Sequence, residues 1–349
     1  MIFASDNWAG AHPAITRRLS DEAAGFSVPY GASELDHVVE KKFNELFERE
    51  VAVFFVATGT AANSLALAAV NRPGGVSFCH REAHMIEDEC GAPEFFTHGA
   101  RLAPVDGENG KIDPQSLKSE IYRFPPGFIH AGQPMAISIT QATEIGTLYH
   151  PDEILAISEI AKNNGLPLHM DGARFANALV ALNLSPAEMT WKRGVDIVSF
   201  GATKNGCWCA EALVFMHPEM AADLPFIRKR AAQLFSKTRF IASQFDAYLN
   251  DNLWLDMARH ANNMGQRLQN GIITSKNARL AWRAEANEVF CIVDKELEDQ
   301  LRQKGAVFYA WNPPRSKPGL LGENEILLRL VTSFATEEDE VDRFIDLLG

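Results

Sequence analysis

The sequence predicts an α/β protein in which a large, mostly parallel sheet is followed by a smaller α+β region. The chain has 349 residues, of which 46% are apolar, so it can bury an extensive core and is longer than one ordinary domain. Short β-branched runs alternate with helical stretches through most of the chain, and the last third follows a different pattern.

The first predicted strand spans residues 51–57 (VAVFFVA), and a helix is predicted directly after it at residues 61–70. A helix at residues 151–164 begins at a proline and is followed by Gly165, which is the usual asymmetry of helix ends. Short apolar strands between helices favour a parallel sheet that is covered on both faces. The further strands are predicted at residues 76–80, 135–140, 166–171, 195–200 and 212–217.

The last third begins with a long run of helix formers at residues 226–268. We expect the domain boundary inside this run. A large domain then covers residues 1–250, with its N-terminal segment contributing to the functional site, and a small α+β domain covers residues 251–349. The small domain has predicted strands at 288–294 and 326–333, and predicted helices at 296–305 and 336–348.

The charge balance and the cysteines narrow the class of protein. Lys and Arg number 33 against 45 Asp and Glu, a net charge of −12, which disfavours nonspecific binding to nucleic acid or anionic lipid. No apolar stretch approaches the length of a membrane helix, and the N-terminus does not read as a signal peptide. An odd number of scattered cysteines, five, fits reduced thiols, and Cys207 and Cys209 lack the partners of a metal site. We therefore expect a cytoplasmic protein without a metal.

A Thr-Gly-Thr turn joins the first predicted strand to its helix in the segment VAVFFVATGTAAN. Gly59 allows a close approach of the backbone, Thr58 or Thr60 offers a hydroxyl group, and the free N–H groups of the helix point outward. This is an anion site, most naturally for phosphate. Considered alone, the turn is equally an ordinary one with a threonine N-cap. No GxGxxG or P-loop pattern occurs, so dinucleotide binding is poorly supported.

Two further strand ends carry charged residues. The segment LPLHMDGAR places Asp171 at the carboxyl end of a strand, where it can hold a cationic ring nitrogen, with Arg174 one turn later. The segment VDIVSFGATKNG places Lys204 in the loop after the next strand, where partial desolvation favours a nucleophilic amine. Considered alone, Asp171 also fits a helix cap, and Lys204 also fits a solvated loop lysine.

The combination of these three strand ends predicts a cofactor. Carboxyl ends of parallel strands share one edge of a sheet, so the phosphate site, the aspartate and the lysine are expected side by side. These are the groups that pyridoxal 5′-phosphate (PLP) needs: a lysine for a Schiff base, an acid to keep the ring nitrogen protonated, and a helix end for the phosphate. The sequence therefore predicts PLP.

The pieces TGTAAN, HMDGAR and SFGATKNG, in this order, resemble the low-specificity L-threonine aldolases, which are PLP enzymes of fold type I. The opening Ser5-Asp6, the Tyr30-Gly31 segment, REAHMIEDE and LRLVTSF match as well, so the resemblance covers nearly the whole chain. HMDGAR is the most specific of these pieces. The resemblance implies a fold-type I architecture of the aspartate aminotransferase kind.

The resemblance also implies roles around the cofactor. Lys204 is the Schiff-base lysine, Asp171 pairs with the ring nitrogen, and Arg174 contacts the O3′ side. Gly59 and Thr60 bind the phosphate. His84 stacks on the ring and is the leading general base. Arg239 corresponds to an arginine that reaches the phosphate across a subunit interface.

On the substrate side, the resemblance implies that Ser5 and Arg329 hold the α-carboxylate, and a bidentate guanidinium suits that group. Tyr30 is a wall residue or a contact across subunits. One position departs from the family: Glu144, in TQATEIG, stands where many members have a second active-site histidine. Glu144 can accept the β-hydroxyl proton, orient the base or be a solvated loop carboxylate.

The implied activity is retro-aldol cleavage of L-threonine, L-allo-threonine and related L-β-hydroxy-α-amino acids to glycine and an aldehyde. Other PLP chemistry is an alternative, such as that of a phenylserine aldolase, a β-eliminating lyase or an aminotransferase, because a fold does not determine a reaction. A catalytically silent PLP-binding protein and an α/β binding protein without PLP are alternatives of another class. Fold-type I sites lie between subunits, which implies a homodimer or homotetramer that binds a small amino acid.

Overall fold

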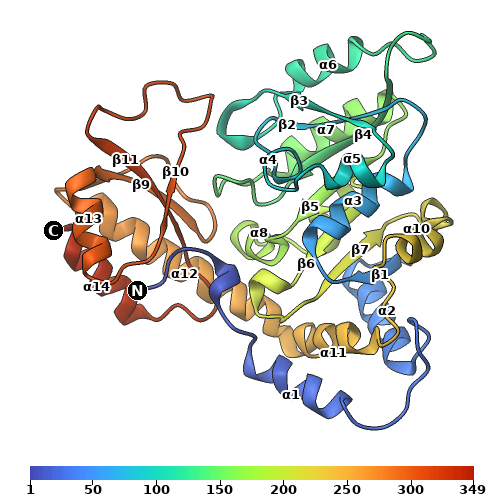
Figure 1. Cartoon of the computed structure of the whole chain (residues 1–349), viewed down its shortest axis with the longest axis horizontal. Coiled ribbons are helices and arrows are strands. Elements are labelled where there is room, and N and C mark those ends of the chain that lie inside the picture. Colours follow the sequence, from blue (N-terminus) through green and yellow to red (C-terminus); the bar gives the residue numbers. More distant parts are fainter.

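The computed structural model describes all residues, 1–349, as two β-sheets with helices packed against them. The long helix α12 (Leu253–Thr274) runs from one sheet to the other, with the large sheet on the right and the small sheet on the left of Figure 1. None of the helices is both long enough and apolar enough to cross a membrane.

The large sheet has seven strands in the order β1-β7-β6-β5-β4-β2-β3. Only β7 is antiparallel to its neighbours, so the carboxyl ends of the other six strands share one edge. Six of the seven strands coincide with predicted ones, and β3 was not predicted. The strands are β1 (Ala52–Val56), β2 (Gly75–His80), β3 (Arg101–Val105), β4 (Gln133–Thr140), β5 (Leu168–Gly172), β6 (Ile197–Gly201) and β7 (Glu211–Phe215).

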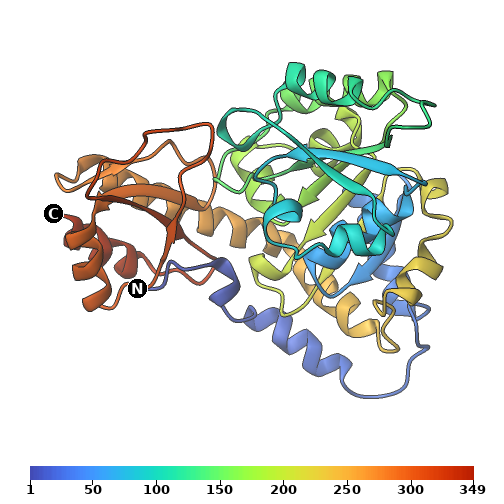
Figure 2. The same ribbon diagram turned by 45° about the horizontal axis from the view of Figure 1, so that its top comes forward.

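Helices cover both faces of this sheet (Figure 1, Figure 2). The main core of 48 buried residues joins one face to α2, α6, α7, α8 and α11. On the other face, α3 and α10 share apolar clusters with the strands, and α5 packs against α3. The helices are α1 (Pro13–Glu22), α2 (Glu34–Leu46), α3 (Gly59–Ala69), α4 (His84–Glu87), α5 (Ala92–Phe96), α6 (Pro114–Tyr122), α7 (Pro151–Asn163), α8 (Phe175–Leu182), α9 (Pro186–Met189), α10 (Leu224–Arg230) and α11 (Arg239–Tyr248).

The small sheet is antiparallel throughout, in the order β10-β11-β9-β8. Alternation along its strands turns Cys291 and Leu328 toward the helices, whereas Phe290 and Leu327 pack with Ile145 of the large domain. Its strands are β8 (Ala278–Leu280), β9 (Glu288–Asp294), β10 (Tyr309–Trp311) and β11 (Glu325–Val331), and besides α12 its helices are α13 (Lys295–Gln303) and α14 (Glu338–Leu348).

The predicted helical run at residues 226–268 is wrong as one element. The structure breaks it into α10, α11 and the start of α12. Asp251 and Asn252 have φ angles of 49° and 59°, in the left-handed region, which cannot continue an α-helix. The turn-forming residues Asn250, Asp251 and Asn252 mark this break, and the predicted run extended across them because good helix formers lie on either side.

The N-terminal segment contacts both the small sheet and the helices of the large sheet. Ile2 forms a bridge with Val307, and Phe3 is buried in the core of the small sheet against Phe344. The chain then passes to the large sheet, where α1 packs along α11 (Figure 1, Figure 2). A division into a large domain of residues 1–250 and a small domain of residues 251–349 stays our proposal.

Candidate active site

A cavity of about 260 Å³ opens at the carboxyl edge of the large sheet. It contains six of the predicted site residues together: Gly59, Thr60, His84, Glu144, Asp171 and Lys204. The other residues of its wall are Asn7, Ala57, Thr58, Asn63, Glu89, Ala173, Thr203 and Glu211. These residues come from strand ends, from helices α3 and α4, from the loops that follow α4 and β4, and from the segment before α1, so the cavity is assembled by the fold rather than by one motif.

The first turn of α3 forms an anion cradle in this cavity. Thr58 is the N-cap, and its hydroxyl oxygen accepts a hydrogen bond from the N–H of Ala61 at 3.1 Å. The N–H groups of Gly59 and Thr60 have no acceptor in the protein. A Cβ atom at Gly59 would meet nothing within 4 Å, so the backbone there faces open space. The cradle therefore fits a phosphate group.

Asp171 is a buried carboxylate that lacks a cationic partner. Only 4% of the residue is exposed, and its oxygens accept hydrogen bonds from the N–H of Ala173 at 3.1 Å and from the side-chain amide of Asn63 at 2.8 Å. It makes no ion pair. An unpaired buried charge is costly, so a cation in the cavity stabilises it. The protonated ring nitrogen of PLP is such a cation.

His84 is held by a second buried carboxylate. Its Nδ1 lies 2.9 Å from Oε1 of Glu89, which also accepts a hydrogen bond from Asn63 at 2.8 Å. The hydrogen bond to Glu89 raises the pKa of His84 above its ordinary 6.5, and burial opposes this effect. Asn63 thus links the carboxylates of Glu89 and Asp171. Glu89 belongs to an acidic run, residues 87–89, that the sequence indicates is structural or supports the site, whereas the place of Asn63 was not predicted although it lies in a motif segment.

Lys204 lies in a short 3₁₀ turn, Thr203–Asn205, directly after β6. Its amine makes no hydrogen bond and no ion pair, although it lines the cavity. The turn itself is fixed by Asn205, whose side chain donates to Tyr248 and to the carbonyl of Trp254, both at 2.8 Å. A rigid turn thus presents a lysine whose amine is free to react.

Arg174 lies outside the cavity wall, in a buried ion-pair network. It donates to both oxygens of Asp6, at 2.7 and 3.0 Å, and its third nitrogen lies 3.1 Å from Glu288. Arg329 binds the other oxygen of Glu288 at 2.6 Å. The neighbouring Ser5 caps a 3₁₀ turn by accepting from the N–H of Asn7, a wall residue. Ser5 and Arg329 do not line the cavity but are linked to it through Asn7 and this network.

We expect Asp6→Ala to destabilise the protein by about 3 kcal/mol at pH 7, because it leaves the buried Arg174 charge poorly compensated. Burial alone would raise the pKa of Asp6, but Arg174 and Lys204 lower it below 3.8. The stability that Asp6 contributes is thus present above pH 4 and lost as the pH falls further. Urea unfolding at pH 7 and pH 3 measures this. An equal difference between wild type and variant at both pH values would contradict it.

Tyr30 and Arg239 lie away from this cavity in the same chain. Tyr30 is about half exposed, and the amine of Lys229 lies 5.2 Å from the centre of its ring. Arg239 is the first residue of α11, and its closest carboxylate is Glu22 at 3.7 Å. Neither residue lines the cavity of its own chain, and contact with a second subunit stays a proposal.

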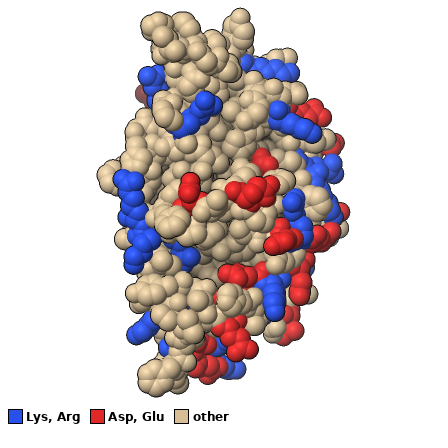
Figure 3. All heavy atoms as spheres, turned by 90° about the vertical axis from the view of Figure 1, so that its right-hand side faces the viewer, with Lys and Arg blue, Asp and Glu red and all other residues tan.

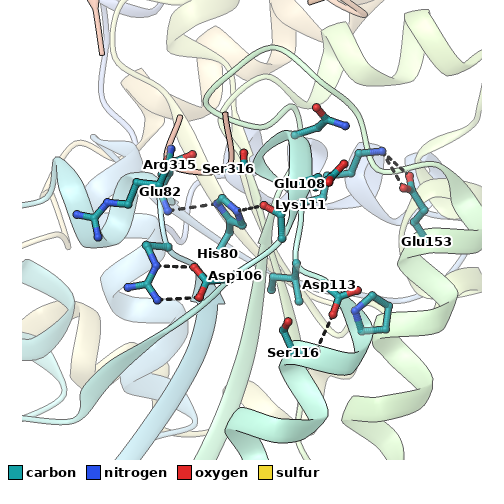
Figure 4. Close-up of a pocket in the computed structure, with 15 residues that line it drawn as sticks. His80, Glu82, Asp106, Glu108, Lys111, Asp113, Ser116, Glu153, Arg315 and Ser316 are labelled. Carbon is teal, nitrogen blue, oxygen red and sulfur yellow. Dashed lines mark hydrogen bonds and ion pairs between the residues drawn. The ribbon is translucent and has the colours of Figure 1, made fainter. Parts of the chain in front are cut away.

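A larger cavity, of about 810 Å³, lies beside β2 and β3 (Figure 4). Its charged side chains face one another: Arg81 pairs with Asp106 at 2.6 Å and Lys111 with Glu153 at 2.8 Å. His80 is held between the carbonyl of Gly107 and the N–H of Glu82. Because these groups satisfy one another, this cavity is a poorer site for chemistry than the smaller one.

Comparison with known proteins agrees with this geometry. The family model described as beta-eliminating lyase matches residues 3–296. The chain belongs to the beta-eliminating lyase family. The low specificity L-threonine aldolase of Pseudomonas aeruginosa is 41% identical over 309 residues, which cover 88% of this chain and 89% of that protein. The corresponding protein of a Pseudomonas species is 40% identical with the same coverage.

Among solved structures, the threonine aldolase of Leishmania major superposes with a TM-score of 0.92 and 28% identity, over 99% of this chain and 98% of that one. These relationships confirm the predicted fold class, a PLP enzyme of fold type I with a mixed, mostly parallel sheet. They also confirm the predicted PLP dependence and the enzyme class, a lyase.

Proposed function

We propose that this lyase cleaves L-threonine, L-allo-threonine and related L-β-hydroxy-α-amino acids between Cα and Cβ, giving glycine and an aldehyde. The observation that carries the proposal is the cavity in which the free amine of Lys204 and the unpaired Asp171 lie beside the open end of α3. The names of relatives that are 40–41% identical over most of the chain support the same reaction.

Each group around the cofactor has a stated task in this proposal. PLP, when bound, withdraws electrons from the substrate Cα. Lys204 would hold the cofactor through its amine, which has no other partner in the cavity. Asp171 keeps a proton on the ring nitrogen, and the N–H groups of Gly59 and Thr60 bind the phosphate. His84 would contact the ring through its imidazole.

Orientation of the substrate is assigned to Ser5 and Arg329. They would hold the α-carboxylate and so fix the orientation of the Cα–Cβ bond, which favours cleavage of that bond over the others at Cα. Arg174 helps to position Arg329, because both guanidinium groups bind the carboxylate of Glu288.

His84 is proposed as the base that accepts the β-hydroxyl proton, with Glu144 as the alternative. Only Nδ1 of His84 is occupied, by Glu89, so Nε2 is free to accept a proton. Glu144 lines the cavity without a hydrogen bond or ion pair, and burial raises its pKa. A neutral histidine is required, so kcat/KM should rise with pH through a pKa above 6.5.

The test is to incubate the purified holoenzyme with L-threonine and to measure acetaldehyde and glycine. His84→Asn is expected to lower kcat/KM by on the order of 10²-fold and to remove the rise with pH, whereas Glu144→Gln should lower it less than about tenfold. Exchange of the glycine α-proton with deuterated water is the control, because it needs no base at the β-hydroxyl.

The outcomes separate the alternatives. Loss of cleavage in Glu144→Gln with normal glycine exchange would make Glu144 the base. Release of pyruvate or formation of a keto acid instead of acetaldehyde would indicate elimination or transamination. No turnover of any β-hydroxy amino acid by a cofactor-loaded protein would indicate a silent PLP-binding protein.

We also propose that the protein is a homodimer or homotetramer with active sites at the subunit interface, in which Tyr30 and Arg239 reach the cavity of a neighbouring subunit. The face on the right of Figure 1 has broad areas of uncharged side chains, as Figure 3 shows. The large exposed side chains Phe26, Phe95 and Phe226 are the kind of surface that subunit contacts bury. The unpaired cysteines support a cytoplasmic location.

A further inference from the structure

Glu211 occupies a central place at the catalytic edge of the large sheet. It is the first residue of β7, the strand that lies between β1 and β6 (Figure 1). Its Cα is paired with Val56, the last residue of β1, and with Gly201, the last residue of β6. The first of these strands leads to the anion cradle and the second leads to Lys204. Glu211 therefore lies between the anion cradle and Lys204.

The carboxyl group of Glu211 is buried but lacks adequate partners. The residue is 6% exposed, and one oxygen accepts a long hydrogen bond from the N–H of Thr203 at 3.4 Å. The side chain makes no ion pair, its other neighbour able to donate a hydrogen bond is the hydroxyl group of Thr203, and it lines the cavity. Burial raises the pKa of Glu211 to about 7, so the group takes up a proton easily near neutral pH.

An anion in the cradle changes the preferred state of this group. An ionised carboxylate beside a phosphate dianion is repelled, whereas a protonated carboxyl group donates a hydrogen bond to it. We propose that Glu211 is a further cofactor-binding residue, which takes up a proton from solvent when PLP binds and donates a hydrogen bond to the phosphate. This inference rests on the phosphate lying at Gly59 and Thr60, and not on which amino acid is cleaved.

Other titratable groups face Glu211 and must be separated from it in any test. Lys204 and Asp171 lie across the cavity, and their charges act on Glu211 in opposite directions. Cys209 and Cys207 precede it on the same segment, and Tyr248 of α11 lies within reach of its charge. All five are unchanged when Glu211 is replaced by glutamine, so the difference between wild type and Glu211→Gln isolates the Glu211 proton.

The experiment measures binding without turnover. Pyridoxamine 5′-phosphate, which forms no bond to lysine, is titrated into the full-length apoprotein, and the affinity is followed by tryptophan fluorescence. The affinity of the wild type should fall roughly eightfold from pH 7.5 to 8.5, because the proton on Glu211 is lost through a pKa of about 7. The affinity of Glu211→Gln, which keeps a hydrogen-bond donor, should lack this eightfold fall.

Three controls make the result decisive. Glu219→Gln, at an exposed glutamate beyond the other end of β7, should behave as the wild type. Glu211→Ala, which has neither the donor nor the charge, should bind more weakly than Glu211→Gln at every pH, without the slope. Pyridoxamine without its phosphate should bind wild type and Glu211→Gln with the same pH dependence. Equal slopes for the phosphorylated probe in wild type and Glu211→Gln would overturn the proposal, whatever the outcome of the threonine assay.

Discussion

Replacement of Lys204 by alanine is expected to reduce turnover of L-threonine by on the order of 10⁴-fold, because the variant loses the amine that bonds to the cofactor. The fold should be unaffected, since the lysine amine makes no contact that the surrounding turn needs and Asn205 holds that turn. Cofactor should still bind, through the cradle at α3 and through Asp171. Steady-state kinetics and cofactor content measure the two effects separately.

Borohydride reduction followed by mass spectrometry sharpens this prediction. Wild type should acquire one covalent cofactor per chain at the peptide containing Lys204, and Lys204→Ala should acquire none. Lys192→Ala is the matched control, because Lys192 is an exposed lysine paired with Glu48. Full activity in Lys204→Ala, or a reduced adduct on another lysine of the wild type, would show that the assignment of this residue is wrong.

The central strands of the large sheet could be predicted because parallel strands that are buried on both faces are continuous apolar runs. The strand β3 could not, because it lies at the edge of the sheet and its sequence, RLAPV, contains an exposed Arg101 and a proline. The strands β8 and β10 have only three residues each, which is too short for a periodic pattern.

Within the site, local motifs predicted Gly59, Asp171 and Lys204, because each is positioned by the end of its own strand. Glu211 was missed for a different reason. Its role depends on β7 being inserted between β1 and β6, and no local pattern reports the lateral order of strands. The position of Arg174 could not be predicted either, because its partner Asp6 is 168 residues away in the sequence.

Replacement of Asp171, which lies in a buried hydrogen-bond network, is expected to cause the second large loss of activity. Asp171→Asn keeps the shape of the side chain but removes its negative charge, so the ring nitrogen of the cofactor loses the partner that keeps it protonated. We expect a fall in kcat for L-threonine on the order of 10²–10³-fold, the size seen when a charge-stabilising group is removed from an active site. Dialysis should also strip cofactor faster from the variant than from wild type.

Asp106→Asn is the control for Asp171→Asn, and Asn63→Ala is the informative contrast. Asp106→Asn changes a carboxylate that follows β3 and pairs with Arg81 at the surface, and it should leave both kcat and cofactor retention unchanged. Asn63→Ala removes the amide that joins Asp171 to Glu89. It should lie between wild type and Asp171→Asn, because the carboxylate keeps its charge but loses one of two hydrogen bonds. Normal turnover by Asp171→Asn would mean that the ring nitrogen is protonated by another group, and Asn63→Ala would then have no effect through Asp171.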